Sequence, residues 1–357
     1  MRKRRKTREV RIGNVAIGAE NAIAVQSMTK TDTADVNNTI LQINTLAQGG
    51  CDIIRCAVPD IKASQAIAKI KEGIAIPLVA DIHFDYRLAL SAIESGADKI
   101  RINPGNIGGF ERTAQVLAAA KAKECAVRIG VNSGSLSKDL LEKYGEPTPE
   151  ALVEDALRYV VFAEEQGFYD LVISIKSSDV QTTYEANMLF STQCDYPLHI
   201  GVTEAGTYED GMIKSAAGIG ALLLGGVGDT LRVSLSDEPI REIEAGKSIL
   251  RLLGIEKKGV EVISCPTCGR CKANVIAYAK QVREKTKNIE PHAKLAVMGC
   301  AVNGPGEAKE ADIGLAFGHE NAVLFAHGEI VKHVKTEEAV KTLLQHLEEF
   351  LDKRQQE

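Results

Sequence analysis

The sequence predicts a TIM (β/α)8 barrel followed by a small α+β domain, and three observations support this. Short apolar runs alternate with amphipathic segments from about residue 20 to residue 255. The alternation then gives way to a different pattern in the last hundred or so residues. Aromatic residues make up only 4% of the chain, so the core must consist of Ile, Val, Leu and Ala, as is typical of parallel sheets.

The apolar runs are the expected barrel strands, and there are eight of them. They occupy residues 22–28, 51–58, 75–84, 99–105, 126–134, 170–178, 197–206 and 229–236. Eight βα units in about 235 residues match the length of a TIM barrel. An open doubly wound sheet is the alternative, but its GxGxxG fingerprint is absent after the first run.

The segments between the runs have the apolar spacing of helices, as in 62–73, 87–97 and 110–124. Asp60, Asp85 and Thr148 stand where helix N-caps are expected. Before the first run, residues 7–18 read as a hairpin closed at Gly13-Asn14, which we expect to plug the barrel floor.

The barrel is expected to end with an eighth helix over 237–255, followed by the short linker EKKG. Beyond it come two strands that each end in a Cys-containing turn, a helix, three further apolar strands and a final helix. We therefore predict a barrel domain over residues 1–255 and a small α+β domain over 256–357.

Charge and composition exclude several classes of protein. The net charge is −5, and six of the first eight residues are basic, so the rest of the chain is distinctly acidic and unlike a nucleic-acid binder. We interpret the basic start as a solvated tail. No apolar run approaches the roughly 18 residues of a membrane span, and no signal peptide is visible, so we expect a cytoplasmic protein.

Cysteines in the second domain form the most informative pattern. Cys265 and Cys268 follow one predicted strand in SCPTCGRC, and Cys300 follows another in GCAVNGPGE. Both turns are rich in Gly and Pro and stand at strand ends, so they can face each other and offer N–H groups to a cluster. The pattern favours an iron–sulfur cluster over a structural zinc site or unrelated buried thiols.

The fourth ligand has two candidates, Cys271 and Glu307. Cys271 completes a CxxCxxC run, which resembles that of ferredoxins. Four thiolates would close the cluster for electron transfer, whereas a labile carboxylate would leave one iron able to act as a Lewis acid. The spacing does not decide between them.

The carboxyl ends of the predicted barrel strands carry a concentration of cations, on five different strands. Catalytic groups of TIM barrels lie at this face. The cations are Arg55, Arg101, Arg128, Lys176 and Arg232. Arginine and lysine in such a cluster indicate a site for at least two phosphates.

Acid–base candidates stand at the same ends. They are Glu204, which we expect to lie among the cations, Asp81 and His83. Asn132, His199 and Ser234 complete the polar groups there. The alternative is that each Arg forms an ordinary salt bridge within the barrel and that His83 is a structural histidine. This explanation is weaker for five cations together than for a single one.

Taken together, the motifs VQSM, DIHF, RINPGNIG, VNSGSL, GVTEAG, GDTLRVSLS, SCPTCGR and GCAVNGPGE resemble one known family over nearly the whole chain. They are similar to those of the 4-hydroxy-3-methylbut-2-enyl diphosphate synthases, in their two-domain bacterial form. These enzymes belong to the methylerythritol phosphate route of isoprenoid (terpenoid) biosynthesis. The resemblance implies an iron–sulfur oxidoreductase that opens and dehydrates 2-C-methyl-D-erythritol 2,4-cyclodiphosphate with two electrons.

The resemblance also implies roles for residues. A [4Fe-4S] cluster would be held by Cys265, Cys268, Cys300 and Glu307, with Cys271 as an extra thiol. The diphosphate would be bound by Arg55, Arg101, Arg128, Lys176, Arg232 and Ser234, and Asn132 and Glu204 would lie near the carbon skeleton. Reduced flavodoxin or ferredoxin would be the donor.

A short linker restricts how the cluster domain can reach its own barrel mouth, and the family's solution is a head-to-tail homodimer. The competing function is an iron–sulfur electron carrier or cluster-transfer protein on a barrel platform, which needs no cations at the mouth. A phosphate-ester enzyme with structural zinc is a further alternative. A radical enzyme that uses S-adenosylmethionine is disfavoured, because the CxxxCxxC spacing is missing.

Overall fold

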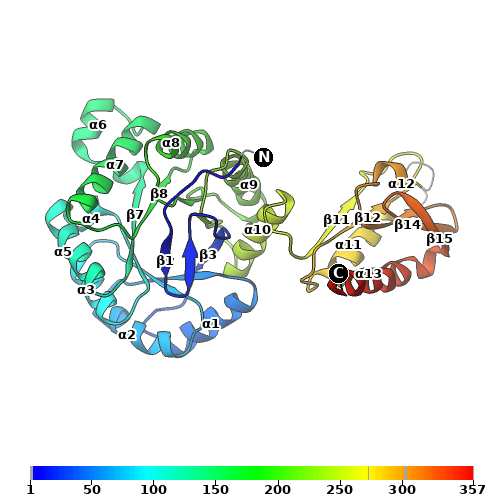
Figure 1. Ribbon diagram of the computed structural model, residues 1–357, viewed down its shortest axis with the longest axis horizontal. Helices are drawn as coiled ribbons and strands as arrows, with labels where there is room; N and C mark the ends of the chain where they lie inside the picture. Colours follow the sequence, from blue (N-terminus) through cyan, green and yellow to red (C-terminus); the bar gives the residue numbers. More distant parts are fainter. Residues whose placement is uncertain (1–2, 272, 301–303, 357) are drawn as a thin grey trace. The chain divides into compact units, whose positions relative to one another are not determined.

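The computed structural model describes residues 3–271, 273–300 and 304–356, without the side chains of Glu307, Gln355 and Gln356. The chain forms two compact units, residues 1–249 and 250–357. Figure 1 shows the ring of helices around the strands of the first unit and the separate sheet of the second.

The first unit is the predicted barrel. Its parallel strands are β3 (Ala24–Met28), β4 (Ile53–Ala57), β5 (Leu78–Asp81), β6 (Lys99–Ile102), β7 (Ala126–Asn132), β8 (Leu171–Lys176), β9 (His199–Ile200) and β10 (Thr230–Leu231). Each predicted apolar run contains one of them. The pairing order is β8-β7-β6-β5-β4-β3-β10-β9, and a bridge between Ile173 and Leu198 joins the two ends. The barrel prediction is therefore confirmed.

Helices surround these strands. They are α1 (Val36–Gln48), α2 (Ile61–Glu72), α3 (Tyr86–Glu94), α4 (Pro104–Ile107), α5 (Gly109–Ala122), α6 (Lys138–Tyr144), α7 (Pro149–Glu165), α8 (Val180–Gln193), α9 (Tyr208–Leu224) and α10 (Pro239–Leu252). The predicted caps are confirmed: the side chains of Asp60, Asp85 and Thr148 accept hydrogen bonds from N–H groups of the first turns of α2, α3 and α7.

The barrel floor is closed by a hairpin of β1 (Val10–Ile12) and β2 (Val15–Ile17), as predicted. Its apolar side chains join one buried cluster with the lower ends of five barrel strands. Water is therefore excluded from the floor, and the interior opens toward the carboxyl ends of the strands.

The prediction of a solvated basic tail is wrong for Arg4 and Arg5. Arg4 Nη2 lies 2.6 Å from Oδ1 of Asp229, a carboxylate that is 1% exposed. The Arg5 guanidinium donates to the carbonyls of Cys194 and Tyr196, and its backbone N–H donates to Gly226. The tail is held in place because the buried carboxylate of Asp229 needs a cation to offset its charge. The spacing of residues along the sequence does not show that Asp229 is buried.

The second unit has one five-stranded sheet in the order β11-β12-β13-β14-β15. The strands are β11 (Val260–Ser264), β12 (Ala293–Met298), β13 (Ile313–Phe317), β14 (Asn321–Ala326) and β15 (Glu329–Lys335), of which the first three are parallel. Helices α11 (Val275–Thr286) and α13 (Ala339–Gln356) share one core with the sheet. The short helix α12 spans Gly304–Glu307. The next residue, Ala308, packs with Phe325 in a second, smaller buried cluster. This confirms the α+β prediction.

Candidate functional site

The interior of the barrel is arranged in layers, because the parallel register steps one residue from each strand to the next and alternate strands supply one layer. The lowest of three successive layers consists of Ile53, Lys99, Val172 and Thr230. The middle layer consists of Gln26, Val79, Arg128 and His199. The upper layer consists of Arg55, Arg101, Ser174 and Arg232. Asp81 and Lys176 stand above them. The five predicted cations are thus brought into one interior.

Asp81 is the hub of this interior. It is fully buried, and its Oδ1 lies 3.2 Å from Nη1 of Arg101, while its Oδ2 lies 3.5 Å from Nη2 of Arg55. Nε2 of His83 lies 3.1 Å from the same Oδ2. Burial alone would raise the pKa of Asp81, but the charge of Arg55 and the contacts of His83 and Arg101 outweigh it and hold that pKa well below its usual range.

Arg232 is held in the same way by a carboxylate that sequence reasoning missed. Its Nη2 lies 3.1 Å from Oε1 of Glu242, a buried residue of α10. The same carboxylate accepts from Ser27 Oγ and from the backbone N–H of Leu235. No motif marks Glu242, since it reaches the interior from the helix that follows the last strand.

Arg128 and Lys176 have no such carboxylate among the described residues. Arg128 is 2% exposed, and neither its Nε nor its Nη1 has a hydrogen-bond partner in the described chain. Burial lowers the pKa of both groups well below their ordinary values, and the neighbouring cations lower them further. Burial likewise lowers the pKa of Arg55 to about 10, against the charge of Asp81. Such a surplus of positive charge is suited to a polyvalent anion.

Two glycines make room for these cations. A Cβ at Gly130 would lie 3.2 Å from Nε of Arg101, and one at Gly201 would lie 2.8 Å from Nζ of Lys176. Small residues at these points let the two long side chains lie across the interior. The sequence contains both glycines, but only the register shows which cations they face.

The remaining candidates lie at the rim, except for His199. His83 is half-exposed, and Asn132 accepts from Ser135 Oγ at its amide oxygen. Glu204 is exposed, has a left-handed φ of 50°, and makes no ion pair with a described cation. We predicted that Glu204 lies among the cations, but no ion pair with a described cation supports this. His199 shares a layer with Arg128, one layer below Arg55, Arg101 and Arg232, and is fully buried.

In the second unit, the two Cys-containing turns stand at strand ends, as predicted, and the structure shows that these two strands are adjacent and parallel. β11 pairs with β12 up to Ser264 and Val297, so Cys265 and Gly299 leave the sheet together. The backbone N–H of Gly299 donates to Sγ of Cys265 at 3.2 Å. This is the kind of N–H contact that stabilises a thiolate in a cluster.

The other thiols of these turns differ in setting. Cys268 is exposed, and hydrogen bonds with the backbone and side chain of Arg270 lower its pKa. Cys271 is half-buried against the core, and its Sγ donates to the carbonyl of Ala273 at 3.1 Å. Cys271 therefore has a packing role that Cys268 does not have.

The part of the chain that the structure describes does not bring three Cys, His, Asp or Glu side chains close enough together to hold a metal ion. Cys300 is described, but residues 301–303 and the side chain of Glu307 lie outside the described residues. The three predicted cysteine ligands therefore lie on turns that follow neighbouring strands. The position of the Glu307 carboxylate lies outside what the structure describes.

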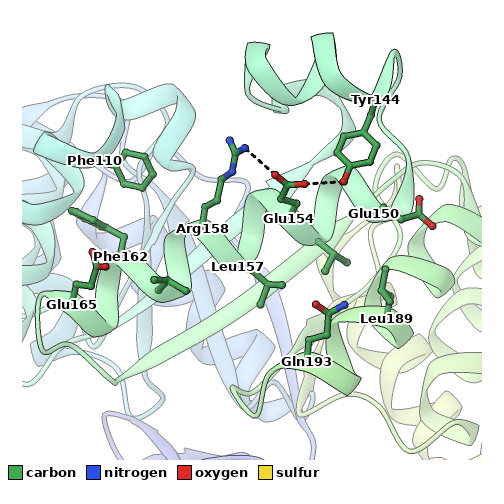
Figure 2. A pocket seen from close by; sticks show the side chains of 12 residues that line it. Phe110, Tyr144, Glu150, Glu154, Leu157, Arg158, Phe162, Glu165, Leu189 and Gln193 are labelled. Carbon is green, nitrogen blue, oxygen red and sulfur yellow. Dashed lines mark hydrogen bonds and ion pairs between the residues drawn. The ribbon is translucent and has the colours of Figure 1, made fainter.

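A separate hollow of the barrel unit lies on its outer face. A groove of about 1000 Å³ is bordered by residues of α5, α7 and α8, including Phe110, Leu157 and Leu189 (Figure 2). Its Glu154 is already paired with Arg158 and Tyr144, as Figure 2 shows. The groove is mainly apolar and contains none of the interior cations, so it is not the candidate site for a polyvalent anion.

Over the described residues, no helix is long and apolar enough to cross a membrane.

Comparison with family models gives two matches. Residues 7–247 match the GcpE TIM-barrel domain, and residues 261–349 match the GcpE protein C-terminal domain. Among solved structures, a dihydropteroate synthase from Stenotrophomonas maltophilia is similar in fold, with a TM-score of 0.50 and 15% identity over 70% of this chain and 99% of that chain.

Curated relatives match over nearly the full length. One from Caldanaerobacter subterraneus subsp. tengcongensis is 58% identical over 98% of both chains, and one from Clostridium perfringens is 55% identical over 97% of this chain and 99% of its own. Both are named 4-hydroxy-3-methylbut-2-en-1-yl diphosphate synthase (flavodoxin).

Proposed function

The chain belongs to the GcpE family, and we propose that it is a flavodoxin-dependent 4-hydroxy-3-methylbut-2-enyl diphosphate synthase. It converts 2-C-methyl-D-erythritol 2,4-cyclodiphosphate into the linear allylic diphosphate and water, with two electrons. The observation that carries this reading is the match of both units to relatives with that name, over nearly the whole chain.

The cations of the barrel interior are the proposed binding site for the cyclic diphosphate. Arg128 and Lys176 have donors that no described carboxylate uses, and two phosphates supply the missing acceptors. Asp81 orients Arg55 and Arg101, and Glu242 orients Arg232, so their guanidinium groups do not have to be ordered when the substrate arrives. Ser234 adds a hydroxyl at the same rim.

His83, Asp81, Asn132 and Glu204 are the proposed groups around the carbon skeleton. Asp81 contacts Nε2 of His83, which leaves Nδ1 of a half-exposed imidazole as the position that can exchange a proton. Glu204 is held in a strained backbone conformation at the rim, and such strain persists at sites where geometry matters.

A [4Fe-4S] cluster is the proposed cofactor, held by Cys265, Cys268, Cys300 and Glu307. The described residues fit such a group, since Gly299 N–H points at Cys265 Sγ and the pKa of Cys268 is lowered. When bound, the cluster supplies the electrons and a Lewis-acidic iron. In this assignment residues 1–255 bind the diphosphate and residues 256–357 carry the cluster, in a cytoplasmic protein.

We test the reaction by following reductant consumption. Cluster-loaded protein is mixed anaerobically with reduced flavodoxin or ferredoxin, and the cyclic diphosphate is then added. We expect oxidation of the donor only after the addition, with two electrons used per substrate. An Arg128→Met variant should lose about tenfold to hundredfold in kcat/KM, because a buried charge-assisted contact is lost. Donor oxidation that is independent of substrate would support the electron-carrier alternative instead.

We also propose a head-to-tail homodimer, in which the cluster domain of one chain serves the barrel of its partner. Mixing inactive Glu204→Ala chains with inactive Cys300→Ser chains tests this. Random exchange should restore about a quarter of wild-type activity, since half of the dimers then contain one intact site. Absence of recovery in dimers that have demonstrably exchanged would rule out the shared site.

A further inference from the structure

The lower part of the barrel interior holds a polar cluster, of which the proposed reaction uses only Arg128. Its members, which we call the deep cluster, come from two successive layers: Gln26, Lys99, Arg128, His199 and Thr230. All of them are buried. A packed apolar layer would be the ordinary filling of a TIM barrel at this depth.

Lys99 is the most unusual member. It is fully buried, and its Nζ has no hydrogen-bond partner among the described residues. The side chains that share its layer are Ile53, Val172 and Thr230, none of which is ionisable. Lys99 was missed in the sequence because it looks like the polar start of the run KIRINPG, although it alternates with Arg101 on one face of β6.

The charged and titratable groups that face Lys99 do not offset an ammonium charge. Those from β4 and β7 are Arg55 and Arg128, both cations. The Cys125 thiol precedes β7, and burial raises its pKa to about 12, so it stays neutral. Asp98, the residue before Lys99, is instead paired with Lys71. Burial lowers the pKa of Lys99 well below its ordinary value, and Arg128 lowers it further.

The remaining titratable member, His199 on β9, is also poorly satisfied. Its Nε2 has no hydrogen-bond partner within the described part of the chain, and its Nδ1 is 3.5 Å from Thr230 Oγ1. Both polar side-chain atoms of Gln26 likewise lack partners in the described chain. Burial lowers the pKa of His199 well below its usual range, and Lys176 and Arg128 lower it further. So many unsatisfied groups in adjacent layers indicate ordered water or an ion between them.

We propose that Lys99 is a neutral amine in the free protein and takes up a proton when the anionic substrate binds in the layers above it. This inference rests on the proposed function, since it takes the cyclic diphosphate as the anion. A neutral amine avoids a third like charge beside Arg55 and Arg128. Two phosphates bring two negative charges close to these cations and offset part of their repulsion, so the ammonium form becomes favourable. The free protein is thereby spared a buried charge that the complex requires.

The test is calorimetric titration of the full-length, cluster-loaded protein with the cyclic diphosphate, anaerobically and without reductant, so that no turnover occurs. Each phosphorus of this ligand has one ionisable oxygen, which is strongly acidic, so the ligand itself takes up no proton near neutral pH. Titration in two buffers of different ionisation enthalpy gives the number of protons absorbed. Repeated from about pH 7 to about pH 9, the titration should show uptake that approaches one proton per substrate, because the pKa of Lys99 in the free protein is lowered well below its ordinary value.

Two variants locate the proton. Lys99→Met keeps the length of the side chain and should reduce the uptake to near zero. Lys69→Met makes the same change on an exposed position of α2 and should leave the uptake as in the wild type. Wild-type protein gives a second measurement that needs no variant: proton uptake makes affinity fall by up to about tenfold for each unit that the pH rises in this window.

The outcomes are distinguishable. Tight binding with no proton uptake in the wild type overturns the inference and leaves the proposed function intact. Unchanged uptake in a folded Lys99→Met protein, with loss in His199→Gln, overturns it in favour of the histidine. Failure of the wild type to bind the cyclic diphosphate at all counts against the proposed function itself.

Discussion

At the scale of single residues, Asp81 connects the stability of the barrel to its proposed substrate site. Its carboxylate contacts Arg55, Arg101 and His83, and it is fully buried. Removing one partner from a buried ion pair is more costly than never having had the pair, because the remaining charges stay desolvated.

We therefore expect Asp81→Asn to lower the free energy of unfolding by about 3 kcal/mol. Asp139→Asn is the matched control, since Asp139 pairs with Arg158 on the surface, and it should change stability little. Denaturant unfolding measures both. Added cyclic diphosphate should recover part of the loss for Asp81→Asn, because the ligand's charge then balances the two arginines. Equal effects of the two variants would contradict the role given to Asp81.

Gly130 makes a second prediction at this scale. In Gly130→Ala the new methyl group would lie 3.2 Å from Nε and 3.3 Å from Nη2 of Arg101, so the guanidinium must move by a few tenths of an ångström. We expect KM to rise about tenfold while stability changes little, because only the substrate contact is displaced. Gly220→Ala, in α9 with no atom within 4 Å of the new Cβ, is the control and should leave KM unchanged. Steady-state kinetics decide, and an unchanged KM for Gly130→Ala would contradict the assignment of Arg101.

The residues that sequence reasoning found and missed differ in a physical way. Arg55, Arg101 and Arg128 were found because strand ends in a barrel point to one place. Glu242 was missed because it acts from a helix, and its partner Arg232 is known only once the chain is folded. Lys99 was missed because the depth of a residue in a barrel depends on the register between strands.

At the scale of elements, the N-terminal segment is part of the barrel. Arg4 pairs with the buried Asp229, whose other oxygen accepts from the backbone N–H of Leu198 at the start of the β9 strand region. The segment was interpreted as solvated because six basic residues in eight favour that reading on composition alone.

We expect Arg4→Met to lower the free energy of unfolding by about 2 kcal/mol, because Asp229 loses its direct cation while staying buried. Activity per folded molecule should be unchanged. Arg11→Met removes a cation that is 73% exposed and should have no effect. Thermal or denaturant unfolding checks both, and wild-type stability for Arg4→Met would show that the segment is dispensable.

The turn after β12 gives a prediction for the second unit. A Cβ at Gly299 would lie 2.5 Å from Sγ of Cys271 and 2.9 Å from Cγ2 of Val275, so the turn must shift. We expect Gly299→Ala to lose most of its bound iron, measured by iron and sulfide content after anaerobic purification. Gly269→Ala, in the same pair of turns with no atom within 4 Å of its Cβ, is the control.

Cys271 separates packing from ligation. If its thiol only packs, Cys271→Ala should keep its iron. It should also restore part of the iron to Gly299→Ala, because the closest collision, with the sulfur, is gone while that with Val275 remains. Loss of iron in Cys271→Ala alone would instead identify Cys271 as a ligand. The sequence left Cys271 and Glu307 open as fourth ligand, since spacing along the chain does not fix which side chain turns toward the cluster.

At the scale of the whole molecule, the order of elements and the cations at the strand ends were predictable, whereas the deeper polar side chains and the pairing of charges were not. Eight apolar runs, their caps and the hairpin at Gly13 follow from periodicity and turn chemistry, which are local. The balance of charge inside the barrel depends on which side chains meet after folding. Asp81 and Glu242 pair with three of the five cations, whereas Arg128 and Lys176 have no carboxylate partner among the described residues. This surplus is the charge that we propose is matched to a ligand.

Product identity is the most direct test of the account. Cluster-loaded protein with reduced flavodoxin and the cyclic diphosphate should replace the phosphorus resonances of the ring by those of a linear diphosphate, and Cys300→Ser should not do so. Resonances that stay those of the cyclic diphosphate, in a protein that has its iron and accepts electrons, would contradict the assignment of this barrel as the site of reductive ring opening.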